Sequence, residues 1–227
     1  MLRAGEPGAT GYREALEALC RAYWLPLYAY LRRRGCNCHQ AEDYTQGFFA
    51  RLFERQALVR ADPTRGKFRS FLLAALKNFV ADERDYAQAS KRGGGARALP
   101  LDFGEAEARY ALAPSDTLSP EEFFDRSWAL AALQQAMAKL KAEYAEAGKE
   151  HLFERFKGSL QVDANVASYR DMAADVGMSA GAARVAVHRL RRRFRDLVRQ
   201  EIAQTVSEPA EVDEEVNYLF AVLTASV

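Results

Sequence analysis

The sequence of 227 residues contains few cysteines and few histidines, three of each. An odd number of cysteines fits reduced thiols better than a disulfide framework. Cys36, Cys38 and His39 lie close together, but the chain has no second ligand cluster to complete a four-coordinate metal site. The histidines fall in separate segments, and no glycine cluster makes a phosphate-binding loop. The sequence therefore predicts no metal, no cofactor and no catalytic activity.

Long apolar runs are also missing. No run approaches the 18 residues of a membrane span, and the first 20 residues lack the apolar segment of a secretory signal. We therefore expect a cytoplasmic protein without contact to a membrane. No segment has the alternation of a strand, and almost every periodic segment has helical spacing. The sequence predicts an all-α fold.

The net charge is only +1, but the charges are unevenly distributed. Residues 1–92 carry 16 basic and 10 acidic side chains, and residues 167–200 carry 8 and 3. Residues 93–127 carry 3 basic and 7 acidic side chains, and residues 201–227 carry 6 acidic and no basic ones. Two basic blocks separated by an acidic connector suggest two modules that face nucleic acid.

Glycine and proline divide the chain into two expected helical domains. Helices are predicted at 12–24, from Pro26 to before Gly35, at 39–55, from near Phe68, from Ser119 to near Gly148 and at 150–157. Three glycines at 93–95 cannot hold a helix well. We therefore expect a first domain at 1–92, a flexible acidic linker at 93–118, a second domain at 119–200 and an acidic extension at 201–227.

The stretch "SYRDMAADVGMSAGAARVAVHRLRRRFRDLV" predicts two helices joined by a short turn. Ser168 is a plausible cap of the first helix, Gly177 suits its end, and Ser179 suits the cap of the second. A buried stripe and a basic face on the second helix form the pattern of a helix-turn-helix, whose second helix enters the major groove of DNA. An ordinary helical hairpin with a basic surface is the alternative.

Two motifs carry a resemblance to a known family. The segments "AEDYTQGFFARLFER" and "GKFRSFLLAALKNFVADERDYAQASKR" together resemble region two of sigma factors of the extracytoplasmic-function (ECF) branch of the sigma-70 family. Residues 168–195 resemble region four, and the order, separation and intervening linker also match. The resemblance covers about residues 15–92 and 120–200. It implies a protein that binds core RNA polymerase and directs it to promoters.

The resemblance assigns roles to residues of both domains. The docking face for the beta-prime clamp of core RNA polymerase would contain Glu42, Asp43, Gln46 and Arg51, and the beta flap would be a second polymerase contact. The loop from Ala57 to Lys67 would capture a flipped base of the minus-ten element. Contacts to that element would come from Arg60, Arg65, Lys67, Arg69, Lys77, Asn78, Asp82, Arg84, Lys91 and Arg92. The minus-thirty-five element would meet Ser179, Ala180, Gly181, Ala182, Arg184, Val185, His188, Arg189 and Arg192.

One position departs from the family pattern. The family commonly has an acid where this chain has Gly47, and glycine also weakens the centre of the helix.

The sequence leaves other functions open. A stand-alone helix-turn-helix regulator with a helical sensor domain is the first alternative. A metal-dependent nucleic-acid enzyme is disfavoured because the adjacent Glu42 and Asp43 point apart on one helix. Many family members are held by an anti-sigma protein, and nothing in the sequence names one.

The acidic extension lies beyond the resemblance. After Pro209, a short helix is predicted with Val212, Val216, Leu219 and Leu223 on one face and acids in its first turns. We expect this helix to pack against the second domain and to lower non-specific DNA affinity. Docking of a regulator or of polymerase, and disorder, are the alternatives.

Overall fold

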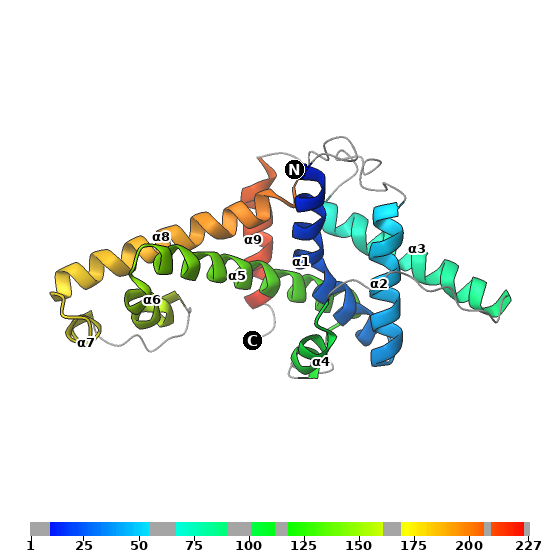
Figure 1. Cartoon of the computed structure of the whole chain (residues 1–227), viewed down its shortest axis with the longest axis horizontal. Helices are drawn as coiled ribbons and strands as arrows, with labels where there is room; N and C mark the ends of the chain where they lie inside the picture. The colour runs from blue at the N-terminus through cyan, green and yellow to red at the C-terminus, as the bar shows by residue number, and fades with distance from the viewer. Residues whose placement is uncertain are drawn as a thin grey trace. The chain divides into compact units, whose positions relative to one another are not determined.

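The computed structural model describes residues 10–54, 67–89, 101–111, 118–160, 169–206 and 210–224. These residues contain helices and no strand, which confirms the all-α prediction. None of these helices is long and apolar enough to span a membrane. The helices labelled in Figure 1 are α1 (Thr10–Arg33), α2 (Cys38–Glu54), α3 (Phe68–Ala89), α4 (Phe103–Ala111), α5 (Pro120–Glu146), α6 (Glu150–Phe156), α7 (Tyr169–Ala174), α8 (Ala180–Ala203) and α9 (Glu211–Thr224). A short 3₁₀ helix, η2 (Lys157–Leu160), follows α6.

The chain divides into two compact units. The first unit comprises Met1–Ala131 with Ala203–Val227, and the second comprises Ala132–Ile202. This division differs from the predicted domains, because the boundary falls inside α5 and the C-terminal extension belongs to the first unit. Helix α4 also lies within the predicted linker 93–118. The positions of glycine and proline indicate where helices are interrupted, but they do not indicate which helices pack together.

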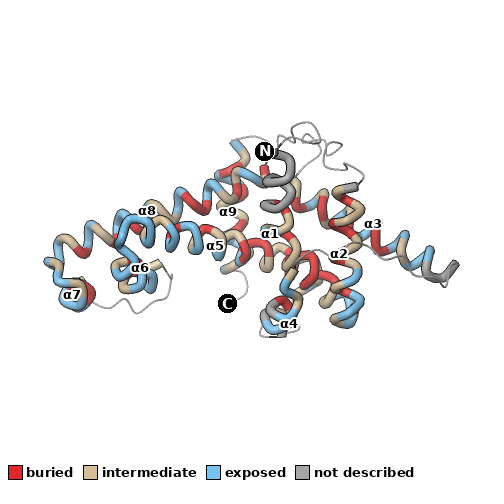
Figure 2. Tube along the Cα trace, in the orientation of Figure 1, coloured by how far each residue is buried: buried red, intermediate tan, exposed pale blue. Residues whose placement is uncertain are grey.

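Helices α1, α2 and α3 supply much of the core of the first unit. The largest fully buried side chains there include Tyr23 and Leu27 of α1, Phe49 of α2 and Leu72 of α3. Figure 2 marks buried positions along all three helices. Helix α1 runs through Pro26, where a new helix was predicted to begin. We attribute the continuity to the burial around Pro26, which offsets the cost of about 3 kcal/mol that proline imposes on a helix interior.

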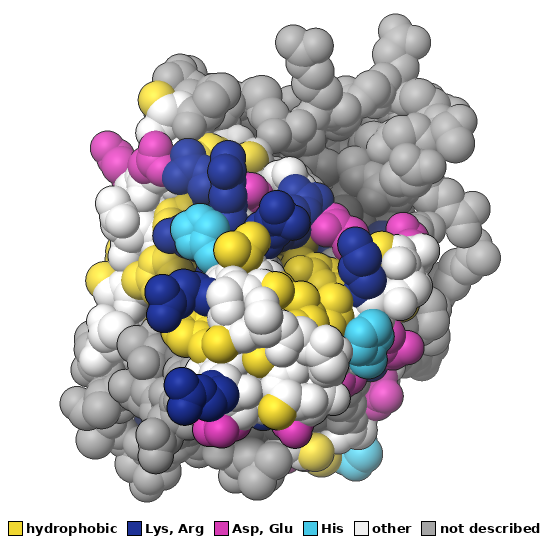
Figure 3. Space-filling model, turned by 90° about the vertical axis from the view of Figure 1, so that its left-hand side faces the viewer, with side chains coloured by type: hydrophobic (Ala, Val, Ile, Leu, Met, Phe, Trp, Pro, Cys, Tyr) yellow, Lys and Arg dark blue, Asp and Glu magenta, His cyan; other side chains and the backbone are white. Residues whose placement is uncertain are grey.

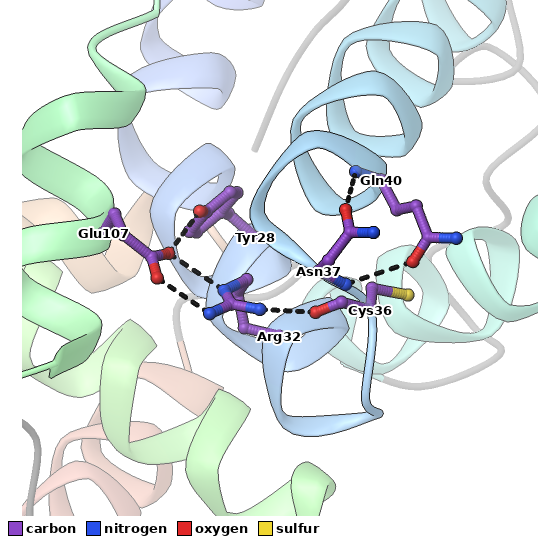
Figure 4. Close-up of polar contacts among 6 residues, drawn as sticks. All are labelled: Tyr28, Arg32, Cys36, Asn37, Gln40 and Glu107. Atoms are coloured by element: carbon purple, nitrogen blue, oxygen red, sulfur yellow. Dashed lines mark hydrogen bonds and ion pairs between the residues drawn. The ribbon is translucent and has the colours of Figure 1, made fainter.

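Helix α4 is attached to α1 by a charged hydrogen-bond cluster (Figure 4). The Glu107 carboxylate accepts two hydrogen bonds from the Arg32 guanidinium, at 2.9 and 2.7 Å, and one from the Tyr28 hydroxyl at 2.5 Å. Arg32 also donates to the carbonyl oxygen of Cys36 at 2.5 Å. The ring of Phe103 meets Trp24 edge to face, with centroids 5.6 Å apart. The predicted linker therefore includes a helix that packs on the first unit.

Glu107 makes a pH-dependent contribution to stability. Hydrogen bonding to Arg32 lowers the pKa of the Glu107 carboxyl group. The carboxylate therefore makes its full contribution to stability above the pKa of about 4.3 that it has in the unfolded chain. This contribution is lost as the pH falls through the lower pKa of the folded protein. We expect Glu107→Gln to lower the free energy of unfolding by about 1 kcal/mol at pH 7, since partial exposure weakens charged hydrogen bonds.

Urea unfolding followed by circular dichroism at several pH values measures this effect. The difference between wild type and Glu107→Gln should shrink towards zero below pH of about 4. Glu146→Gln, at an exposed glutamate of α5, is the matched control and should change stability little at any pH. A difference that persists unchanged into acid contradicts the role given to the Glu107 charge.

Helix α5 begins as the sequence predicted. The backbone N–H of Ser119 donates to the Glu122 carboxylate at 2.8 Å, and the N–H of Glu122 donates to the Ser119 hydroxyl oxygen at 3.2 Å. This reciprocal pair is a capping box, with Pro120 as the first helical residue. Helix α5 spans both units, since the first unit ends at Ala131.

The second unit contains the rest of α5 with α6, η2, α7 and α8. Leu140, Phe156 and Leu190 are fully buried in it. Arg193 of α8 donates two hydrogen bonds to the Glu143 carboxylate of α5, at 2.8 and 2.5 Å. These contacts fix α8 along α5 and leave other sides of α8 open to solvent.

Candidate nucleic-acid interface

The turn between α7 and α8 has the expected geometry. Gly177 has a φ of +66°, a left-handed conformation that glycine adopts without steric cost. The N–H of Met178 donates to the carbonyl of Ala173 at 3.0 Å, which closes the end of α7. Ser179 caps α8, because its hydroxyl oxygen accepts from the N–H of Ala182 at 3.2 Å. The predicted stop and start signals are both confirmed, whereas Ser168 lies outside the described residues.

Helix α8 separates its apolar stripe from a basic face. Its buried residues are Ala183, Val187, Leu190, Leu197, Val198 and Ile202. Of the residues predicted to meet the minus-thirty-five element, Ala182 is half-buried and the exposed ones are Ser179, Ala180, Gly181, Arg184, Val185, His188, Arg189 and Arg192. Figure 3, which views the end of the second unit where α7 and the start of α8 lie, shows lysine and arginine side chains gathered with a histidine. The arrangement can present cations and a small apolar surface to a groove of DNA.

Arg184 is oriented by a neighbouring ring. Its guanidinium lies 5.6 Å from the centroid of Tyr169, the first residue of α7. Such a cation–π contact contributes about 0.5–1 kcal/mol at an exposed site. It restricts the motion of Arg184 while its donors remain accessible.

Helix α2 carries the residues predicted to contact polymerase. Its buried side contains Ala41, Thr45 and Phe49. Asp43 is exposed and Gln46 is half-buried, three residues further along the same helix. Side chains at this spacing are neighbours on a helix surface, so one partner can contact both.

Arg51 and Glu42 are placed differently from Asp43. The Arg51 guanidinium forms an ion pair with the Asp82 carboxylate of α3 at 2.8 Å, and it lies 5.6 Å from the ring centroid of Phe79. Arg51 and Asp82, which were assigned to two different partners, therefore contact each other. Glu42 is half-buried and lines a pocket with Cys38, His39 and Glu107.

The structure explains the glycine at position 47. A β-carbon built on Gly47 would lie 3.0 Å from the Cζ atom of Phe79, at the contact between α2 and α3. Phe79 is 7% exposed and meets Phe48 edge to face at a centroid distance of 5.9 Å. A larger residue at position 47 would therefore press on a ring that is already packed.

We expect Gly47→Ala to lower the free energy of unfolding by about 1 kcal/mol, because overpacking outweighs the gain in helix propensity. In a Phe79→Leu background the same substitution should be stabilising, since leucine leaves space for the new methyl group. Thermal unfolding of the four variants of this cycle measures the effect. Gly181→Ala, where the added carbon meets nothing closer than 3.9 Å, is the control for propensity alone. Equal effects in both backgrounds contradict the packing explanation.

The polar face of α3 is partly open and partly covered. Asn78 and Arg84 are exposed. Lys77 forms an ion pair with Glu121 of α5 at 2.7 Å. This hydrogen bond raises the pKa of Lys77 and lowers the pKa of Glu121. Of the described residues predicted to meet the minus-ten element, Asn78 and Arg84 in the second half of α3 are therefore open to a ligand, whereas Lys77 is engaged by Glu121.

Two further cations at the beginning of α3 are held by carboxylates. Arg69 is 5% exposed and forms ion pairs with Asp125 of α5, at 3.1 Å, and with Glu215 of α9. Lys67 pairs with the same Glu215 at 2.6 Å. Four more predicted contacts lie outside the described residues, as does most of the loop from Ala57 to Lys67; they are Arg60, Arg65, Lys91 and Arg92.

These carboxylates were not foreseen as part of the site. Glu121, Asp125 and Glu215 lie in the two acidic blocks of the sequence, and each contacts a cation of the basic block 1–92. Opposite net charges could have suggested contact between the blocks, although they could not indicate which residues pair. The structure also corrects the tail hypothesis, since these ion pairs attach α9 to the first unit.

The comparison with known proteins agrees with the sequence motifs. The chain is 28% identical over 202 residues to the ECF RNA polymerase sigma factor SigE of Mycolicibacterium smegmatis (strain ATCC 700084 / mc(2)155). The alignment covers 87% of this chain and 68% of that protein. No family model matches the chain, and no solved structure matches it. The 202 aligned residues exceed the length of either compact unit, so the similarity extends into both.

Proposed function

We propose that the chain is an ECF-type sigma factor that binds core RNA polymerase, directs it to specific promoters and assists promoter opening. The observation that carries this proposal is the similarity to an ECF sigma factor over 87% of the chain. Both units contribute, since the proposed polymerase and minus-ten contacts lie on α2 and α3 of the first unit and the proposed minus-thirty-five contacts lie on α8 of the second. A protein in this role is a specificity subunit without catalysis of its own, and it works in the cytoplasm beside the polymerase.

The proposed polymerase contact is the exposed side of α2. Asp43 offers a carboxylate and Gln46 an amide on neighbouring positions, and this combination can accept and donate hydrogen bonds. The beta-prime clamp is the proposed partner of this surface. The beta flap is the proposed partner of the second unit.

The proposed promoter contacts lie on α8 and α3. The first turns of α8, with Arg184, His188 and Arg189, would enter the major groove at the minus-thirty-five element. On α3, the Asn78 amide can pair with a base edge through both donor and acceptor, and Arg84 can bind phosphate. Opening the duplex costs a few kcal/mol for each unstacked base, and contacts to the separated strand offset this cost.

Binding to core RNA polymerase tests the proposal. Purified full-length chain is mixed with core polymerase, and the mixture is analysed by size-exclusion chromatography and native mass spectrometry. We expect a one-to-one complex that excludes a second sigma factor. A stand-alone DNA-binding regulator does not need this complex, so its absence, with DNA binding retained, favours that alternative.

A further inference from the structure

The C-terminal helix α9 is attached to the first unit through a buried carboxylate. The side chain of Glu215 is 3% exposed. One of its oxygens lies 2.6 Å from Nζ of Lys67, and the other is paired with the guanidinium of Arg69. A buried carboxylate is costly unless it is paired in this way. The contact is therefore specific to Glu215 and does not arise from the general acidity of the tail.

An aromatic ring of α9 completes the contact. The ring centroid of Tyr218 lies 4.3 Å from the guanidinium of Arg69 and 5.0 Å from the ammonium of Lys67. The Tyr218 hydroxyl donates to the Asp125 carboxylate at 2.7 Å, and burial together with this hydrogen bond raises the pKa of Tyr218. Glu215 and Tyr218 are three residues apart, so they share one face of α9. Two cations thus meet an anion and a flat ring on the same helix.

An anion beside a flat ring is also what a nucleotide offers. Proteins bind single-stranded DNA by placing cations against phosphates and by stacking rings or guanidinium groups on bases. Lys67 is the last residue of the loop that would capture a flipped base, and Arg69 lies in the first turn of α3. Both segments are proposed to contact the opened strand. The chemistry presented by α9 is therefore the chemistry that this position would meet in DNA.

We propose that α9 occupies in cis a binding site for a nucleotide of single-stranded DNA, with Glu215 in place of a phosphate and Tyr218 in place of a base. Helix α9 must leave Lys67 and Arg69 before that nucleotide can bind. This inference rests on the proposed function, because it takes the separated promoter strand as the ligand. It makes the C-terminal helix an internal inhibitor of DNA binding.

Arg69 exchanges one anion for another when DNA replaces α9. Arg69 also pairs with Asp125 and lies 4.9 Å from the ring centroid of Trp128, both on the part of α5 that belongs to the first unit. When α9 leaves, Arg69 retains these two contacts and gains a phosphate in place of Glu215. The Lys67 side chain is already 40% exposed, so it can reach an incoming strand.

A charge-neutral variant of the full chain tests the inference. Glu215→Gln keeps the shape of the side chain, and Glu214→Gln removes the same charge from an exposed neighbour. Fluorescence anisotropy with a labelled thymidine 20-mer measures affinity at several salt concentrations. We expect Glu215→Gln to bind roughly fivefold or more tightly than Glu214→Gln, as in other coupled equilibria.

A second substitution identifies the cations responsible. Adding Lys67→Ala to Glu215→Gln should weaken strand binding and reduce the salt slope by about 0.7, because one of the two cations that meet phosphates is lost. Equal affinities of Glu215→Gln and Glu214→Gln overturn the inference, and so does an absence of single-strand binding in every variant. The proposed function is judged separately, by complex formation with core polymerase.

Hydrogen exchange of the wild-type chain provides a test that needs no substitution. Saturating thymidine 20-mer should increase amide exchange in residues 211–224 and decrease it in residues 67–82, if α9 leaves as the strand binds. Retained or increased protection of residues 211–224 overturns the inference. That outcome would make α9 a permanent part of the first unit.

Discussion

Asp43→Ala combined with Gln46→Ala is expected to weaken binding to core RNA polymerase roughly 30- to 700-fold. The estimate takes one hydrogen bond of a charged group and one of a neutral amide, together about 2–4 kcal/mol at an interface. Both side chains lie away from the buried stripe of α2, so the fold should tolerate their loss. Titration of labelled protein with core polymerase measures the dissociation constant.

The control for this prediction is Asp85→Ala, an exposed carboxylate on α3 in the same unit. It should bind core polymerase with unchanged affinity. Circular dichroism of the double variant should show normal helicity and an unchanged melting temperature. Undiminished polymerase binding by a folded double variant contradicts the assignment of the α2 surface.

Arg184→Ala and Arg189→Ala are each expected to reduce promoter binding, and the two reductions distinguish two kinds of contact. An arginine that reads a base should cost about 1–3 kcal/mol and relax preference at one position of the site. An arginine that binds phosphate should weaken binding to all sequences and reduce the salt slope by about 0.9. We expect Arg184 to read a base, because it lies in the first turns of α8 and is oriented by Tyr169.

Binding titrations over a panel of promoter variants at several salt concentrations separate these outcomes. Arg195→Ala, at an exposed position further along α8, is the reference for a contact that carries no sequence preference. If Arg184→Ala and Arg189→Ala leave both the preference and the salt slope unchanged, α8 is not the recognition helix.

Local signals in the sequence predicted many helix ends correctly. The helix start at Ser119, the helix end at Gly177 and the cap at Ser179 each depend on residues within one turn, and the structure confirms them. The helix after Pro209 was likewise predicted, and it spans Glu211–Thr224. Such features are determined by neighbouring residues and therefore appear in the local pattern.

Local sequence patterns could not predict contacts between segments that are distant in the chain. Arg32 and Glu107 are separated by 75 residues, and no local pattern links them, so the helix at Phe103–Ala111 was taken for linker. Pro26 is a helix-breaking signal that burial overrides. The acids of α9 were predicted only as residues of its first turns, whereas Glu215 is a buried partner of two cations. In each case a tertiary contact decides the outcome.

Transcription by a reconstituted enzyme tests the central proposal most directly. Core RNA polymerase is combined with the full-length chain and with genomic DNA of the source organism, and the 5′ ends of the transcripts are mapped. We expect discrete start sites that share two upstream sequence elements, and we expect them to disappear when the chain is omitted. Transcripts identical with and without the chain, although the chain is folded and the core enzyme active, would contradict the proposal that it is a sigma factor.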